Sequence, residues 1–386
     1  MIYRIEKFKN INIIQVRWAG QVRRAGYILP FTLMCISVLV WLLTYMFNTS
    51  SVFVPFARMS AQREKAVVLA QSGLQLAISQ LAHKHQDKKD ENKQDKKDIK
   101  KGDANTEQLR ALYQRILPTL NHWQTVQLTA KHDGIDATIE FCISSEDGKI
   151  NINSLYNYKK KEFIDKDFVA KICGRIEKQM QTKGLVQSLD DFFKKNEQGC
   201  QDITELLLAP GFEVFNRFTF YEPNLGKGDT KPFYLTDIFT IYTQKDTLDP
   251  WLLSDSMCGI LECTRASSEK DDIKKRKTLI KKALKEFKVT HDWQIDWDIL
   301  LDPIYSKKFN QLPREIQGTQ GQQKTPTALD KKSKLSHETR PTVFSVMVRA
   351  KVGKVVQKMY AILDRSAVLL PDAESFSVTV KKLYWI

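Results

Sequence analysis

Hydrophobic residues are densest in one run near the N-terminus. Residues 27–47 contain no charged side chain, and four residues soften the apolar run, namely Pro30, Thr32, Ser37 and Thr44. At about 1.5 Å per residue, a helix of this length covers the roughly 30 Å hydrocarbon layer of a bilayer. Core helices of soluble proteins rarely run this long without a charge, so the pattern predicts a transmembrane helix.

The apolar pattern changes after this run but does not stop. Between residues 58 and 83, small and apolar side chains recur at steps of three and four, which is typical of one helix face. These residues are Ala66, Leu69, Ala70, Gly73, Leu74, Ala77, Ile78 and Leu81. We therefore expect residues 48–83 to be the soluble half of one long helix, with this face packed on a sheet.

Strand patterns occur in two regions that are far apart in the chain. Residues 125–130 and 135–143 alternate apolar and polar side chains, and Asp133-Gly134 between them is a hairpin-turn signal. Residues 343–386 are again strand-like. The two regions predict a small antiparallel sheet assembled from both ends of the soluble chain.

Helical spacing prevails between the two strand regions. Phe168, Ile172 and Ile176 lie on one helix face, and so do Leu189 and Phe192. The sequence therefore predicts a helical domain inserted into the sheet.

Two polar stretches predict flexible loops. Residues 84–105 consist mostly of Lys, Asp, Glu, Asn and Gln, and such a segment cannot bury enough apolar surface to become ordered. Residues 310–341 are rich in Gln, Lys, Thr, Gly and Pro.

Charge predicts the orientation of the span. Residues 1–26 hold six basic side chains against Glu6, a net charge of +5, and the next charge is Arg58. The positive-inside rule then keeps the N-terminus in the cytoplasm and exports the bulk of the chain. The whole chain has 386 residues and a net charge of +15. Solvated lysines on helix faces account for that charge, and binding to nucleic acid is the alternative.

Six cysteines are present, and Cys35 lies in the span. The other five are Cys142, Cys173, Cys200, Cys258 and Cys263. An odd number in an oxidising compartment would leave one unpaired. Cys258 and Cys263 are close enough in sequence to form a disulfide, but their spacing alone does not establish one.

The most specific motif is the segment Ser145-Glu146-Asp147-Gly148-Lys149-Ile150-Asn151-Ile152-Asn153. Asp147-Gly148 predicts a turn before a short strand, and the side chains of Asn151 and Asn153 are suited to bond to local backbone. An EF-hand calcium loop is excluded because the further acidic positions and the closing Glu are absent. The segment resembles the Asp-Glu-x-Gly-Lys-Ile-Asn-Leu-Asn signature of the general secretion pathway protein K family, the minor pseudopilins of type II secretion.

A second block resembles the same family. It runs from Ile203 to Phe212 and contains Thr204, Glu205, Pro210 and Gly211, in the order Thr-Glu-Leu followed by Pro-Gly-Phe.

The N-terminus is similar to a prepilin leader. A basic leader ends at Gly26, so cleavage by a prepilin peptidase would fall between Gly26 and Tyr27. Ala25 departs from the usual pattern, in which a basic residue precedes the glycine. Phe31 stands where most pilin-like helices carry Glu, and that absence is a feature of the K subunit, because a buried carboxylate needs a partner in the subunit above.

The resemblance implies an α/β pilin-like fold. It has a long N-terminal transmembrane helix on a small antiparallel sheet, with a large inserted all-α domain of sterile-alpha-motif (SAM)-like units. The implied domains are a leader (1–26), a transmembrane helix (27–47), the soluble half of that helix (48–83), a charged loop (84–105), the first part of the pilin-like domain (106–155), the inserted helical domain (156–309), a second loop (310–341) and the final strands (342–386).

The resemblance also implies a function and partners. The protein would lie in the inner membrane, with the bulk of the chain in the periplasm, and would cap the short type II secretion pseudopilus. Its partners would be the I and J minor pseudopilins, bound through helix packing at Phe31, Leu33 and Leu39, and a prepilin peptidase. Calcium binding is implied by the class, without assigned ligands.

Two other function classes were weighed. An enzyme is not expected, because the six histidines show no metal-ligand spacing apart from His83 and His85, and no nucleophile-elbow, P-loop or dinucleotide motif occurs. The alternative is a membrane-tethered helix-hairpin-helix protein of the competence type, which would bind DNA through backbone amides near Pro210-Gly211. The expected glycine pattern with an adjacent lysine is absent there, so nucleic acid is not the expected partner.

Overall fold

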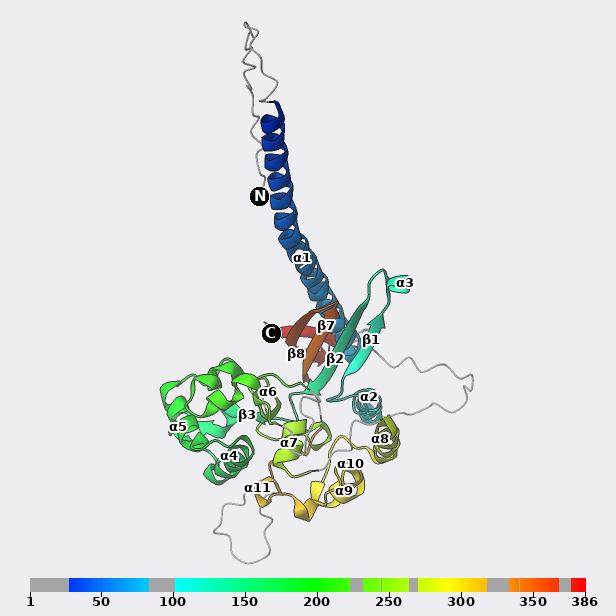
Figure 1. The fold of residues 1–386 in the computed structure, drawn as a ribbon. Coiled ribbons are helices and arrows are strands. Elements are labelled where there is room, and N and C mark those ends of the chain that lie inside the picture. Colours follow the sequence, from blue (N-terminus) through cyan, green and yellow to red (C-terminus); the bar gives the residue numbers. More distant parts are fainter. Residues whose placement is uncertain are drawn as a thin grey trace, which may run out of the picture. The chain divides into compact units, whose positions relative to one another are not determined.

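The computed structural model describes residues 28–82, 101–222, 232–243, 245–263, 270–317, 333–339, 341–367 and 376–386. The chain divides into two compact units, one ending at Ser60 and the other beginning at Ala61. One helix, α1 (Ile28–Ala82), contributes residues to both units (Figure 1).

The first unit contains the apolar part of α1. Its side chains from residue 30 to residue 48 are exposed, and none of them is charged. The hydroxyl groups of Ser37 and Thr44 donate to the carbonyls of Met34 and Val40, at 2.8 and 2.7 Å, so their polar atoms are satisfied within the helix. This helix is long and apolar enough to cross a membrane.

The second unit is built on a five-stranded antiparallel sheet with the order β1-β2-β7-β8-β9. Its strands are β1 (Gln124–Leu128), β2 (Ala137–Ser145), β7 (Val343–Val352), β8 (Val355–Ala367) and β9 (Phe376–Trp385). The predicted sheet from both ends of the soluble chain is therefore present, and β2 pairs with β7 across the long interval between them.

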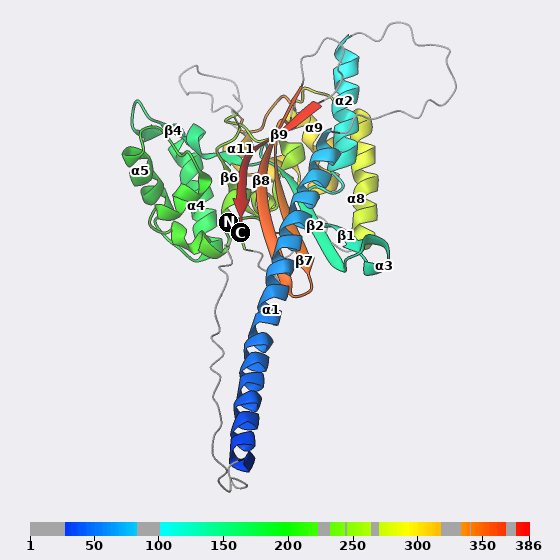
Figure 2. The ribbon, with the colours of Figure 1, turned by 90° about the horizontal axis from the view of Figure 1, so that it is seen from above.

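The soluble part of α1 covers one face of this sheet (Figure 2). Its predicted small and apolar stripe is buried, with Ala66, Ala70 and Ala77 fully inaccessible. The closest approach is at Gly73, where an added Cβ would lie 2.6 Å from Val348 Cγ1 and 2.8 Å from Ile139 Cγ2. Small residues thus let the helix backbone come close to the sheet.

The connection between β1 and β2 differs from a tight hairpin turn. A single helical turn, α3 (Ala130–Asp133), follows β1, and Gly134 ends it in the left-handed conformation with φ 71°. The carboxylates of Asp133 and Asp136 accept bonds from the backbone amides of Thr129 and Ala130. The Asp133-Gly134 signal therefore marks a helix end rather than a two-residue turn.

The residues between β2 and β7 form what we call the insert, residues 146–342, and its described part is mainly helical. Its α-helices are α4 (Lys166–Met180), α5 (Leu185–Lys195), α6 (Leu235–Ile238), α7 (Asp255–Ile260), α8 (Lys270–Ala283), α9 (Trp293–Leu300), α10 (Asp302–Tyr305) and α11 (Arg314–Gln317). Its 3-10 helices are η1 (Ile152–Leu155), η2 (Ile203–Leu208), η3 (Phe212–Arg217), η4 (Pro250–Leu252), η5 (Leu284–Glu286) and η6 (Phe309–Gln311). Two small two-stranded sheets pair β3 (Ile150–Asn151) with β6 (Phe239–Thr240), and β4 (Tyr156–Asn157) with β5 (Glu162–Phe163).

Part of the insert covers the second face of the main sheet. Phe220 and Tyr242 pack with Met347, Tyr360 and Ile362, which point away from α1 because strand side chains alternate. The sheet is thus covered by α1 on one face and partly by the insert on the other.

Two of the stretches predicted to be loops contain ordered elements. Helix α2 (Lys101–Ile116) begins inside the stretch 84–105 that was expected to be a loop. Helix α11 and the buried Leu335, whose backbone bridges Leu248, lie inside the predicted loop 310–341. Leu335 and Ile316 are apolar residues in a polar stretch of the sequence, and tertiary packing buries both.

Candidate functional site

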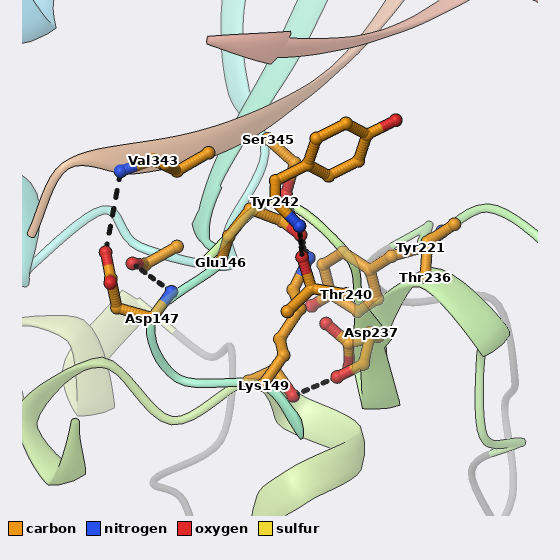
Figure 3. A network of polar contacts seen from close by, with 12 residues as sticks. Glu146, Asp147, Lys149, Tyr221, Thr236, Asp237, Thr240, Tyr242, Val343 and Ser345 are labelled. Atoms are coloured by element: carbon orange, nitrogen blue, oxygen red, sulfur yellow. Dashed lines mark hydrogen bonds and ion pairs between the residues drawn. The ribbon is translucent and has the colours of Figure 1, made fainter. Parts of the chain in front are cut away.

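The first block that carries the family resemblance, residues 145–153, lies where the sheet ends and the insert begins. We call residues 145–153 the junction segment, because it follows β2 and leads into β3 and η1. Strand β7 returns beside it, and the backbone amide of Glu146 donates to the carbonyl of Val343 at 2.9 Å. Figure 3 shows this segment with the start of β7 and the α6–β6 region.

Asp147 joins the exit from the sheet to the return strand. Its carboxylate accepts bonds from the backbone amides of Thr342 and Val343, at 3.1 and 3.5 Å. Its own carbonyl accepts from the amide of Asp249 at 2.8 Å. Burial raises the pKa of the Asp147 carboxyl, while Lys245, 3.9 Å away, and the two amides oppose that shift.

Position 148 has no room for a side chain, so it requires glycine. A Cβ at this position would lie 1.8 Å from the carbonyl oxygen of Leu252 and 2.8 Å from the amide nitrogen of Leu253. Real Cβ atoms do not approach a backbone oxygen so closely, so only glycine fits here without movement of the η4 region.

Lys149 is fully buried and is held by polar partners from two directions. Its ammonium group pairs with the Glu146 carboxylate and donates to Ser345 Oγ of β7 at 3.0 Å. Burial lowers the pKa of Lys149, but Glu146, Tyr360 and Asp237 together raise it by more, so the net shift is upward and the ammonium stays protonated. The pair locks the turn of the junction segment against β7.

Asn151 and Asn153 bond to backbone, but only one of these bonds is to local backbone, as the sequence predicts. Asn151 accepts from the amide of Asn153 at 3.1 Å and donates to the carbonyl of Thr243. Asn153 donates to the carbonyl of Cys200 and accepts from its amide, both at 2.8 Å. The two asparagines therefore hold distant loops of the insert to the junction segment.

Thr204 and Glu205 form the start of η2. Asp202 is the N-cap, accepting from the Thr204 amide at 3.0 Å, and the Glu205 carboxylate bonds back to the Asp202 amide at 3.0 Å. The same Asp202 carboxylate accepts from Tyr384 Oη of β9 at 2.9 Å and pairs with Lys382 at 3.0 Å. The Thr-Glu block is thus a capping box whose N-cap also ties the insert to the sheet.

Pro210 and Gly211 separate η2 from η3, and Gly211 adopts φ 84°. The Gly211 amide donates to the Glu213 carboxylate at 2.6 Å. A phosphate-binding hairpin needs such amides to point at the ligand, and here a carboxylate of the same loop occupies this one. This geometry does not support the DNA-binding alternative.

Two buried carboxylates beside the junction segment were missed by the sequence analysis. Asp249 accepts from Tyr113 Oη at 3.1 Å and from the Trp251 amide at 3.0 Å, and burial together with Asp147 raises its pKa to about 7. Asp237 accepts from the Ser256 amide at 2.6 Å, and burial raises its pKa to about 6. In the sequence, only the position of Asp249 before Pro250 signalled a cap.

The remaining predicted residues lie in or before the span. Gly26 and Tyr27 lie outside the described residues. Phe31, Leu33 and Leu39 are 68%, 59% and 59% exposed, like the other side chains of this part of α1.

In the part of the chain that the structure describes, no group of three or more His, Cys, Asp or Glu side chains is arranged to hold a metal ion.

Comparison with known proteins gave one distant likeness that we report. No family model matches the chain, and no curated protein matches it. Among solved structures, the chain is similar to one chain of the GspK-GspI-GspJ complex from the type 2 secretion system of enterotoxigenic Escherichia coli. The identity is 11%, the match covers 73% of this chain and 94% of that chain, and the TM-score is 0.34.

Proposed function

We propose that this protein is a minor pseudopilin that caps the pseudopilus of a type II secretion system. One observation supports this more than any other. The sheet that packs on the soluble half of α1 is interrupted between β2 and β7 by a mainly helical insert, and the Asp147-Gly148-Lys149 block forms the point of departure. This is the layout that the resemblance to the K family implies.

The apolar part of α1 would anchor the chain in the inner membrane. The +5 charge of residues 1–26 favours a cytoplasmic N-terminus, which sends the sheet and insert to the periplasm. The I and J pseudopilins would pack along the span at Phe31, Leu33 and Leu39. Phe31 and Leu39 lie on one side of the helix with Cys35, whereas Leu33 points to another side. The role is structural and requires no catalysis, and no step of it depends on calcium.

Phe31 is consistent with a terminal position in the filament. A carboxylate at this place would need a partner within the membrane, since an isolated charge there is costly. A subunit with no neighbour above has no such partner, and an apolar side chain then avoids the penalty.

Leader processing tests the proposal directly. Mass spectrometry of the protein from membranes should find Tyr27 as the first residue, and Met1 when the prepilin peptidase is deleted. Gly26→Ala should block cleavage, whereas Gly20→Ala, in the same leader, should not. An intact Met1 in the presence of the peptidase would contradict the proposal and would indicate a membrane-anchored protein outside the pilin class.

Partner packing can be tested with the native Cys35, which is exposed on the same face as Phe31 and Leu39. Single cysteines introduced along the span of the J or I subunit should form disulfides with Cys35 in membranes under mild oxidation. Cys35→Ser should abolish every such product, which shows that Cys35 supplies the thiol. Absence of any crosslink with either subunit would contradict the proposed packing.

A further inference from the structure

The C-terminal end of α7 has a specific backbone geometry that involves two cysteines. The amide of Glu262 donates to the carbonyl of Gly259 at 3.1 Å, and the amide of Cys263 donates to the carbonyl of Cys258 at 2.8 Å. Between them, Glu262 adopts the left-handed conformation with φ 57°. These two bonds and this conformation define a Schellman motif.

A Schellman motif brings two particular side chains together. The residue after the left-handed position frequently packs on the residue five positions earlier, inside the last turn of the helix. In this chain those positions are Cys263 and Cys258, which are 9% and 3% exposed. The two sulfur atoms are not bonded to each other in the structure, but the pairing that spacing alone left open has a backbone geometry in which these two side chains commonly contact each other.

This helix end is also a meeting point of the insert. Lys307, which follows α10, donates to the carbonyls of Leu261 and Glu262 at 3.0 and 3.2 Å. Arg175 of α4 donates to the carbonyl of Ile260. Side chains from two separate parts of the insert thus bond to the last carbonyls of α7. The backbone conformation of this turn determines whether Arg175 and Lys307 can both reach these carbonyls.

We propose that Cys258 and Cys263 form a disulfide that fixes the C-terminal turn of α7. Each thiol loses a proton, one S–S bond forms, and the two electrons pass to a disulfide-bearing oxidant, which is reduced to its dithiol. The bond would hold Glu262, a residue with a side chain, in a backbone region that glycine normally occupies. Its formation in the cell rests on the proposed function, because only export would place these residues in an oxidising compartment.

The sequence makes this bond easy to detect. Cleavage after Lys245 and Arg265 releases a single peptide that contains Cys258 and Cys263 and no other cysteine. The full-length protein is extracted from membranes, denatured in an alkylating reagent without reductant, and digested. We expect this peptide to lack both alkyl groups and to be lighter than the reduced peptide by two hydrogens.

A second measurement separates the inference from the proposed function. Purified, reduced full-length protein is equilibrated with oxidised glutathione and then alkylated in the same way. Formation of the intrapeptide bond supports the inference. Full alkylation of both cysteines, or pairing of either with another cysteine, overturns it. A bond that forms with glutathione but is absent from membranes would count against export, and hence against the proposed function.

A structural role is tested by stability. Reductant should lower the thermal unfolding midpoint of the native protein by a few degrees, and the double variant Cys258→Ser/Cys263→Ser should not respond to reductant. Cys173→Ser, in α4, is the matched control and should keep the response. An equal midpoint with and without reductant in the oxidised native protein would contradict the proposed stabilising role.

Discussion

At the level of single residues, the junction segment combines a steric requirement with buried charge. Gly148 lies against the backbone of Leu252 and Leu253, and its neighbours Asp147 and Lys149 are almost inaccessible. Removal of one partner of a buried ion pair leaves an uncompensated charge, which is why such residues tolerate little change. Residues 147–149 therefore have the features of a rigid structural turn more than those of a reactive site.

Gly148→Ala should destabilise the protein by about 3 kcal/mol or more, because the new methyl group meets backbone atoms that cannot turn aside. Urea unfolding followed by tryptophan fluorescence measures the loss. Gly174→Ala is the matched control, since a Cβ there meets nothing within 4 Å and Gly174 lies inside α4. That variant should gain up to about 1 kcal/mol from helix propensity. Similar unfolding midpoints for the two variants would refute the steric argument.

At the level of elements, the contact between α1 and the sheet depends on small residues. Ala66, Ala70, Gly73 and Ala77 share one helix face, and larger residues there would push the helix away from β2 and β7. The sequence pattern shows the buried face but not how closely the two backbones approach.

Gly73→Leu should lower stability by roughly 3 kcal/mol, because a side chain would overlap Val348 and Ile139. Gln75→Leu adds the same side chain to an exposed position of α1 and should change stability by less than about 0.5 kcal/mol. Thermal unfolding of both variants in detergent measures the difference. If Gly73→Leu unfolds at the same temperature as Gln75→Leu, the close approach has no energetic weight.

The elements show what local pattern could and could not predict. Periodicity predicted strands β7 and β8 and the helical faces at Phe168 and Leu189. These are regular elements whose apolar side chains are buried. The burial of Leu335 depends on the distant Leu248, whose backbone it bridges, so composition predicted a loop there.

The site residues divide in the same way. The bond between Asn151 and the Asn153 amide and the capping contacts of residues 202–205 are local, and their residue types favour them. The bonds of the two asparagines to Thr243 and Cys200 join distant segments, so local pattern did not predict them. The roles of Asp237 and Asp249 arise from burial against segments far away in the chain, which a single sequence does not reveal.

At the scale of the second unit, polar bonds connect the sheet, α2 and the insert into one body. Asp147 bonds to β7, Asp202 to Tyr384 of β9, and Asp249 to Tyr113 of α2. Because each of these carboxylates joins separate elements, their protonation affects the unfolding of the whole unit rather than a local loop.

The pKa values of Asp249 and Asp237, about 7 and about 6, predict how this stability varies with pH. In the unfolded chain an aspartate has a pKa near 4, so between roughly pH 4 and pH 7 the folded state binds more protons than the unfolded state. The free energy of unfolding should therefore fall as pH rises through this window, by up to about 1.4 kcal/mol per pH unit for each proton.

Asp249→Asn removes one of the two protons and should reduce this fall, most clearly between pH 5 and pH 7. The amide keeps an oxygen that can accept from the Trp251 amide or from Tyr113, so the fold should survive the change. Asp246→Asn, at an exposed position three residues earlier, is the control and should leave the pH dependence as it is. Urea unfolding midpoints of the parent protein and both variants, measured at half-unit steps of pH, give the pH dependence of stability for each. Parallel curves for the parent and Asp249→Asn would mean that Asp249 is already ionised in the folded protein at pH 5, and that its burial is compensated by the surrounding donors.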